Sequence, residues 1–178
     1  MATPPQFTAG QVLTAAQMNA VGLWLVKSQA IGSAEASVTV TDAFSADYDN
    51  YLIIMNTTAS IAQSSTITLG ASNTGYYGFL VYGATTSNTV QGEATSNLSS
   101  MRRLGGSSGA TTHVMSVNVM GPYLAQYTKF FASSYNASSE YGTMHGEHRV
   151  ATSYTDFTIG LSTGTISGGT VRVYGYRN

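Results

Sequence analysis

The sequence contains no cysteine, and only 8% of its 178 residues are charged. Without cysteine there are no disulfide bonds, thiol catalysts or thiolate metal sites, so packing and strand pairing must stabilise the fold. Ordinary soluble proteins carry about 25% charged residues, so hydroxyl and amide groups must solvate much of this surface. The formal net charge is −1, and the basic residues are scattered except for Arg102 and Arg103. We therefore expect no nucleic-acid binding.

Long hydrophobic runs are also missing. No segment approaches the ~18 consecutive apolar residues of a membrane-spanning helix. The opening residues, MATPPQFTAG, lack the basic and then apolar stretches of an export signal. We expect no membrane insertion, and synthesis in the cytosol.

After Gly32 the chain consists of short runs rich in Val, Ile, Thr, Tyr and Phe, separated by clusters of Gly, Ser and Asn. This pattern is typical of an all-β protein, and we predict a jelly-roll-like β-sandwich over residues 33–178. The expected strands are Ser37–Thr41, Tyr51–Thr57, Ser65–Leu69, Gly78–Tyr82, His113–Met120, Thr128–Ser134, Met144–Thr152, Phe157–Ser162 and Thr170–Tyr176.

Alternation predicts which face of some strands is buried. In HVMSVNVMG, residues Met115, Val117 and Val119 are in phase and are expected to face the core, while Val114 is out of phase. In TVRVYGY, the valines and Gly175 share one face, and Arg172, Tyr174 and Tyr176 share the other. The run YLIIMN is apolar on both faces, which predicts cover from two sides.

The segment from Ala84 to Thr112 is polar and rich in Gly and Ser, and we interpret it as a long loop. Arg102 and Arg103 are its only concentrated charge. They are either contacts for an acidic partner or ordinary solvated side chains. The runs LGGSSG and TGTISGG are interpreted as turns.

A short helix is predicted ahead of the β-domain, from Thr14 to Lys27. Thr14 and Gln17 fit a capping box, and Leu13 with Met18 fits a hydrophobic staple. An apolar stripe follows, formed by Met18, Val21, Trp24 and Leu25. The stripe packs either on its own β-domain or on a partner, and we treat residues 1–32 as an arm and helix for attachment.

The two chain ends resemble known proteins. FTAGQVLTAAQMNAV and GGTVRVYGYRN resemble the opening and closing segments of tailed-bacteriophage virion proteins, above all tail-fibre and other appendage proteins. A looser likeness covers FSADYDNYLIIMN and LGASNTGYYGFLVYG. The resemblance implies a structural or adhesive virion subunit with a trimeric habit, and it supplies no catalytic residues.

The sequence alone identifies no catalytic or metal site. In MHGEHR, His145 and Glu147 would share one face of a strand while His148 points away, so one strand cannot present all three to a metal ion. G-x-S-x-G occurs as GGSSG and as GLSTG, but neither match is followed by a predicted helix, as a nucleophile elbow requires, and nothing singles out a pair of carboxylates for glycoside cleavage. We expect no enzymatic activity, no metal and no cofactor.

The predicted function is a structural virion protein, a tail-fibre or appendage subunit that lies in the virion as a homotrimer with other virion proteins. The alternatives are a capsid decoration protein and, less favoured, a carbohydrate-binding lectin or glycan-active enzyme. The predicted virion or oligomer contacts are Phe7, Leu13, Met18, Val21, Trp24 and Leu25. The predicted contacts with a receptor, such as a host surface glycan, or with another partner are Arg102, Arg103, Arg172, Tyr174 and Tyr176.

Overall fold

The protein is an all-β, sandwich-like structure in a computed structural model that describes residues 9–12, 14, 22–107, 109–135 and 140–176. These residues contain twelve strands and no helix, and hence no helix that could cross a membrane. The strands are β1 (Trp24–Ala30), β2 (Ser37–Val40), β3 (Asn50–Ala59), β4 (Ser64–Leu69), β5 (Tyr76–Ala84), β6 (Val90–Leu98), β7 (Met101–Gly106), β8 (Thr112–Met120), β9 (Thr128–Tyr135), β10 (Glu140–His148), β11 (Phe157–Leu161) and β12 (Ile166–Tyr176).

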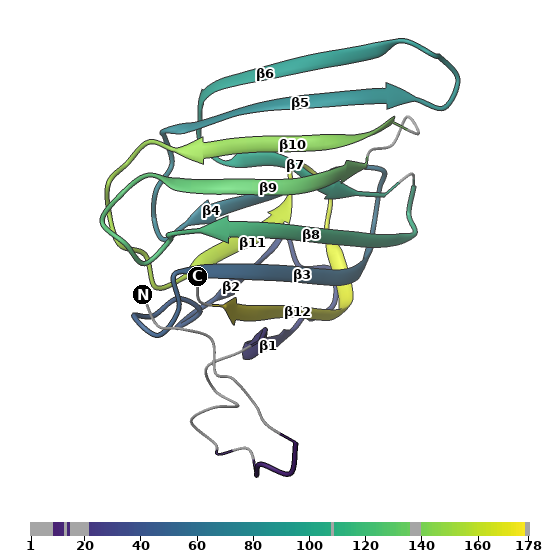
Figure 1. Ribbon diagram of the computed structural model, residues 1–178. Coiled ribbons are helices and arrows are strands. Elements are labelled where there is room, and N and C mark those ends of the chain that lie inside the picture. The colour runs from purple at the N-terminus through teal and green to yellow at the C-terminus, as the bar shows by residue number, and fades with distance from the viewer. Residues whose placement is uncertain (1–8, 13, 15–21, 108, 136–139, 177–178) are drawn as a thin grey trace.

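The strands form two layers. The front layer has the order β1-β12-β3-β8-β9-β10-β5-β6, and the back layer has the order β2-β11-β4-β7 (Figure 1). All neighbouring strands in these layers are antiparallel. A short pairing of β7 with β8, through Gly105 and Gly106, joins the two layers into one sheet. A Cβ at Gly105 would lie 2.5 Å from the carbonyl oxygen of Val114, so this junction requires glycine.

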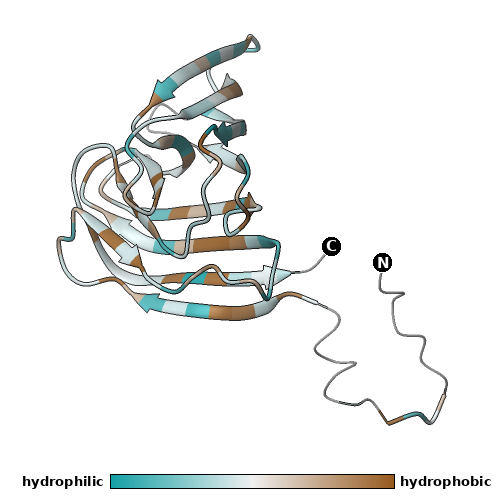
Figure 2. Cartoon of the chain, turned by 90° about the vertical axis from the view of Figure 1, so that its left-hand side faces the viewer, coloured by the Kyte–Doolittle hydropathy of each residue, from teal (hydrophilic) through white to brown (hydrophobic). Residues whose placement is uncertain are grey.

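The core lies between the layers, and the predicted alternation is confirmed. Met115, Val117 and Val119 of β8 are fully buried, whereas Val114 is 49% exposed. On β12, the two valines face the core and Arg172 faces out. Figure 2 shows apolar and polar residues interspersed along the strands, as expected when one face of each strand packs and the other meets solvent.

The run YLIIMN forms the first part of β3 in the middle of the front layer. Ile53 and Met55 are fully buried in the core, while Leu52 and Ile54 on the outer face are partly exposed. Their neighbours across the strands are Tyr174 and Arg172 of β12. The sequence predicted that both faces of this run are covered. In the described chain, the outer face is covered only in part, by side chains of the same sheet.

The prediction of a helix from Thr14 to Lys27 is wrong for the part of this range that the structure describes. Residues 24–27 begin strand β1, and Leu25 and Ser28 pair with Tyr174 and Arg172 of β12. Without β1, strand β12 would be an edge with unpaired backbone groups, and this long-range pairing overrides the helical spacing of the apolar residues. The range predicted as an arm thus contributes a strand to the sheet. Residues 13 and 15–21, which hold the rest of the predicted stripe, lie outside the described residues.

The predicted loop between Ala84 and Thr112 is also corrected, because it contains strands β6 and β7. β6 is the edge strand of the front layer and most of its side chains are exposed, so it lacks the apolar alternation of a half-buried strand. In β7 the alternation is broken at Arg103, a non-glycine residue with a positive φ of 63°. The side chains of Met101 and Leu104 on either side of it are buried.

Candidate functional site

The outward-facing side chains of β5, β9 and β10 line a shared hollow on the front layer. His145 of β10 pairs in register with Phe79 of β5 and with Phe131 of β9. Two residues further along β10, Glu147 pairs with Tyr77 and with Lys129 in the same way. Because side chains alternate along a strand, these two rows lie on the same face and next to each other.

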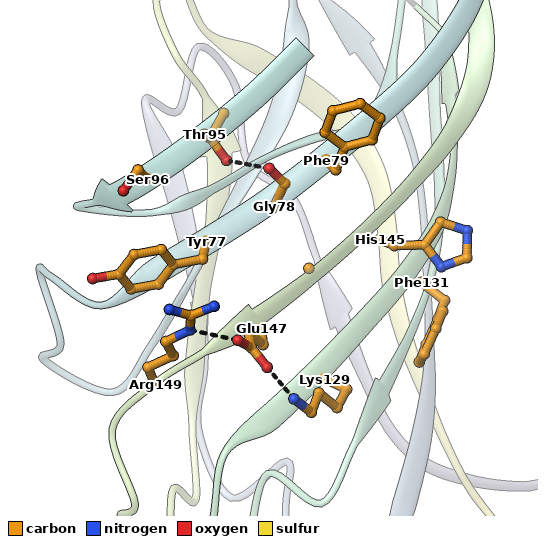
Figure 3. A pocket seen from close by; sticks show the side chains of 11 residues that line it. Tyr77, Gly78, Phe79, Thr95, Ser96, Lys129, Phe131, His145, Glu147 and Arg149 are labelled. Carbon is orange, nitrogen blue, oxygen red and sulfur yellow. Dashed lines mark hydrogen bonds and ion pairs between the residues drawn. The ribbon is translucent and has the colours of Figure 1, made fainter. Parts of the chain in front are cut away.

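We call this hollow the front groove, and it has a volume of about 530 Å³. Figure 3 shows one row of Phe79, His145 and Phe131, and a second group of Tyr77, Arg149, Glu147 and Lys129. Thr95 and Ser96 of the neighbouring strand β6 complete its wall. The Thr95 hydroxyl donates a hydrogen bond to the Gly78 carbonyl at 3.3 Å, which ties β6 to the groove.

Charged side chains in the front groove are held by one another. The Glu147 carboxylate accepts hydrogen bonds from Lys129 and from Arg149, one on each oxygen. These bonds, from Lys129 above all, hold the pKa of Glu147 below its ordinary value. The Arg149 guanidinium also lies 4.1 Å from the centre of the Tyr77 ring, in a cation–π contact. The polar end of the groove is therefore pre-oriented.

Aromatic rings form the other end of the front groove. Phe79 is 51% exposed and Phe131 is 38% exposed, which is unusual for phenylalanine. The Phe131 ring meets the His145 ring edge to face, with 5.2 Å between ring centres. Two exposed apolar rings thus flank an imidazole that can donate and accept hydrogen bonds.

His148 points the opposite way, into the molecule, as the alternation in MHGEHR predicts. Its Nε2 lies 2.8 Å from the Ser72 hydroxyl and 3.1 Å from the Thr74 carbonyl oxygen. Burial lowers the pKa of His148, and the hydrogen bond to Thr74 opposes that shift. The residue fastens the turn before β5 to the end of β10. In the part of the chain that the structure describes, no three His, Asp or Glu side chains gather as a metal site.

The front groove is suited to binding rather than to acid–base cleavage. Among the described residues that line it, Glu147 is the only carboxylate. Glycoside cleavage normally needs two carboxyl groups, one of them able to donate a proton, and the two cations beside Glu147 favour its ionised form. The lining instead offers exposed rings beside fixed hydrogen-bonding groups.

The predicted contact residues fall in several places. Trp24 is partly exposed and Leu25 is 56% exposed on β1. Arg172, Tyr174 and Tyr176 lie together on the outer face of β12, as predicted, and the Tyr176 hydroxyl donates to Asn118 at 3.3 Å. Phe7, Leu13, Met18 and Val21 lie outside the described residues.

The two arginines of β7 do not act as a pair. Arg102 is exposed, whereas Arg103 forms an ion pair with Glu93 of β6 at 2.8 Å. One of the two arginines predicted to bind a partner is therefore already paired within the protein itself. Neither arginine lines the front groove.

Sequence reasoning missed most of the front groove. It noted His145 and Glu147 only as possible metal ligands, and it did not single out Phe79, Lys129 or Phe131. One signal was present: in TKFF, Phe130 and Phe131 are adjacent, so one of them must face away from the core. Phe130 is fully buried and Phe131 is the outward ring.

Comparisons with known proteins do not assign this chain to a family. No protein-family model matches the sequence, and no curated protein matches it. Among solved structures, the chain is similar to the crystal structure of the Caenorhabditis elegans galectin LEC-6, with 12% identity and a TM-score of 0.36, over 82% of this chain and 95% of the galectin.

This result corrects the predicted function. The structure that the chain is similar to here is that of a galectin, and no comparison points to a phage tail-fibre or capsid decoration subunit, so we give up that assignment. A likeness at this TM-score carries no argument about what the chain binds. The resemblance at the chain ends, the virion location and the homotrimer stay predictions.

Proposed function

We propose that the protein is a carbohydrate-binding module whose ligand lies in the front groove. The observation that carries this proposal is the exposed Phe79–His145–Phe131 row beside the ion-paired set of Lys129, Glu147 and Arg149. Sugars have both apolar ring faces and hydroxyl groups. A site for them therefore combines exposed rings with fixed polar groups, as this groove does.

The aromatic end would bind the apolar faces of pyranose rings. Phe79 and Phe131 keep a large part of their rings exposed in the described chain. Covering the exposed part of such a ring removes apolar surface from water and stabilises a complex by about 1 kcal/mol. His145 lies between them in register, where its ring nitrogens can reach a hydroxyl group of the same sugar.

The polar end would bind sugar hydroxyls without a large ordering cost. Glu147 is held between two cations, and Arg149 is also held by Tyr77. Side chains already fixed in one orientation lose little rotamer freedom when a ligand arrives. The set carries two positive charges and one negative charge, and both cations are already paired with Glu147, which favours a neutral sugar over a highly charged one.

We also keep the jelly-roll-like arrangement as a proposal. Two pairings that bring the ends of the chain together support it, β1 with β12 in the front layer and β2 with β11 in the back layer. A double-sheet jelly roll is built from antiparallel strands that connect in this way across the two sheets. The front groove then lies on the outer face of one sheet.

The test is a glycan array followed by titration calorimetry on the glycans that bind. We expect binding to neutral oligosaccharides, and we expect Phe131→Ala to weaken it by about fivefold, since covering the exposed part of this ring contributes about 1 kcal/mol. The matched control is Tyr141→Ala, which removes a 51% exposed ring from the same face of β10 but outside the groove. It should leave the affinity unchanged.

Thermal unfolding of each variant checks that it is folded. Because both rings are substantially exposed, neither substitution should greatly lower the melting temperature. No binding to any glycan on the array would contradict the proposed function. Equal losses in the two variants would show that the sugar binds elsewhere on this face.

A further inference from the structure

The aromatic row of the front groove continues across most of the front layer. Strand register places one outward residue from each of six neighbouring strands in line. They are Phe79, His145, Phe131, Asn118, Leu52 and Tyr174. We call this line the transverse row. It runs at right angles to the strands, from β5, beside the edge strand β6, to β12, beside the edge strand β1 (Figure 1).

A second hollow extends the front groove along the transverse row. It shares Phe131 and His145 with the front groove and reaches Asn118 on β8. Its other walls include Ser116, Ser133 and Thr143, which are short hydroxyl-bearing side chains. The Tyr176 hydroxyl donates to Asn118 Oδ1 at 3.3 Å and so orients that amide. Ring contacts and hydrogen-bonding groups therefore follow one another along the row.

The spacing of the row suits a chain of sugars. Neighbouring strands are about 4.8 Å apart, so the five steps from Phe79 to Tyr174 span about 24 Å. A pyranose unit in an extended β-1,4-linked chain advances by nearly the same distance as one strand step. The row thus corresponds to about six sugar units, with rings at its first, third and last positions.

The composition of the row also favours a neutral chain. None of its six members carries a formal charge, apart from the histidine when it is protonated. The charged set of Lys129, Glu147 and Arg149 lies beside one end of the row only. At the opposite end, the outward residue of β1 in register with Tyr174 is the uncharged Leu25, and one cation, Arg172, lies beside the row at the next outward position of β12.

On this basis, and resting on the proposed function, we propose that the ligand is an extended, neutral β-1,4-linked glycan. It lies across the strands along the transverse row, with Phe79, Phe131 and Tyr174 as ring platforms. The front groove binds one end of the chain. Tyr174 binds a part of the same chain that a short oligosaccharide cannot reach.

The experiment compares chain lengths by titration calorimetry on the full chain. The probes are the trimer and hexamer of β-1,4-linked glucose and of β-1,4-linked N-acetylglucosamine. In the series that binds, we expect the hexamer to bind at least about tenfold tighter than the trimer, because only the hexamer spans the row. Tyr174→Ala should remove that gain and leave trimer affinity unchanged, whereas Tyr174→Phe, which keeps the ring, should retain it.

The outcomes separate this inference from the proposed function. Phe131→Ala should weaken both trimer and hexamer, since both occupy the front groove. If trimer and hexamer bind equally well, or if Tyr174→Ala leaves the hexamer unaffected, the transverse row is not the binding track although the groove still binds sugar. If neither series binds while other glycans on the array do, the ligand class is wrong. If no glycan binds at all, the proposed function itself fails.

Discussion

Replacing Gly169 by alanine is expected to destabilise the protein by about 3 kcal/mol or more. Gly168 and Gly169 form a bulge in β12, where the register with β3 shifts between Ser167 and Thr170. Gly169 has a φ of +82°, which costs a residue with a Cβ about 1–2 kcal/mol. A Cβ there would also overlap the carbonyl oxygen of Asn56 on β3, and this backbone atom cannot move without breaking the sheet.

The matched control for this prediction is the preceding residue. Gly168 has a φ of +64°, but a Cβ at this position would meet no atom within 4 Å. Gly168→Ala should therefore cost only the conformational term, about 1–2 kcal/mol. Urea unfolding of both variants measures the difference. Equal losses in stability would mean that the contact with β3 does not constrain the bulge.

Acid should destabilise the protein before its carboxylates titrate, and His113 should be the main cause. The His113 side chain is fully buried on β8, with Nε2 2.5 Å from the Ser65 hydroxyl. Its Nδ1 has no hydrogen-bond partner within the described part of the chain. Burial lowers the pKa of His113 from its ordinary 6.5 to about 4, because protonation would place a charge in the core.

The direction of the effect follows from the two pKa values. Between pH 6.5 and about 4 the unfolded chain binds a proton at His113 that the folded chain does not, so stability falls as the pH falls. The free energy of unfolding should drop by about 2–3 kcal/mol between about pH 7.5 and about pH 4.5. Urea unfolding at a series of pH values measures this slope.

Two variants identify the group responsible. His113→Gln is neutral at every pH and should remove most of the slope, whatever it does to stability at neutral pH. His148→Gln should remove only a smaller part of it. A smaller part should remain in His113→Gln, because burial also lowers the pKa of His148. A wild-type slope that survives His113→Gln undiminished would rule out His113 as its source.

Alternation in the sequence was enough to predict most of the fold. Each of the nine predicted strands overlaps a strand of the structure. The prediction was reliable where one face of a strand is buried and the other is not, as in β8 and β12, because burial then imposes a period of two on the side chains. The missed strands, β1, β6 and β7, lack that contrast.

Local patterns misled where distant pairing decided the outcome. At Trp24 to Lys27 the apolar spacing favoured a helix, but β12, almost 150 residues later in the chain, supplies the hydrogen-bond partners of a strand. In SGG the two glycines indicated a turn, yet they form a bulge inside β12 because β3 runs alongside. In both cases the deciding contact is far away in the sequence and leaves no local signal.

By itself, the sequence determined the fold class, the inward faces of β8 and β12 and the absence of any thiol chemistry. It also placed Arg172, Tyr174 and Tyr176 on one face. Only the tertiary structure decided that β5, β9 and β10 are neighbours, and thus that Phe79, His145 and Phe131 meet. The physical reason is that alternation along a strand sets which way a side chain points, whereas strand order and register set which side chains lie beside it. Strand order and register depend on how the twelve described strands pack together.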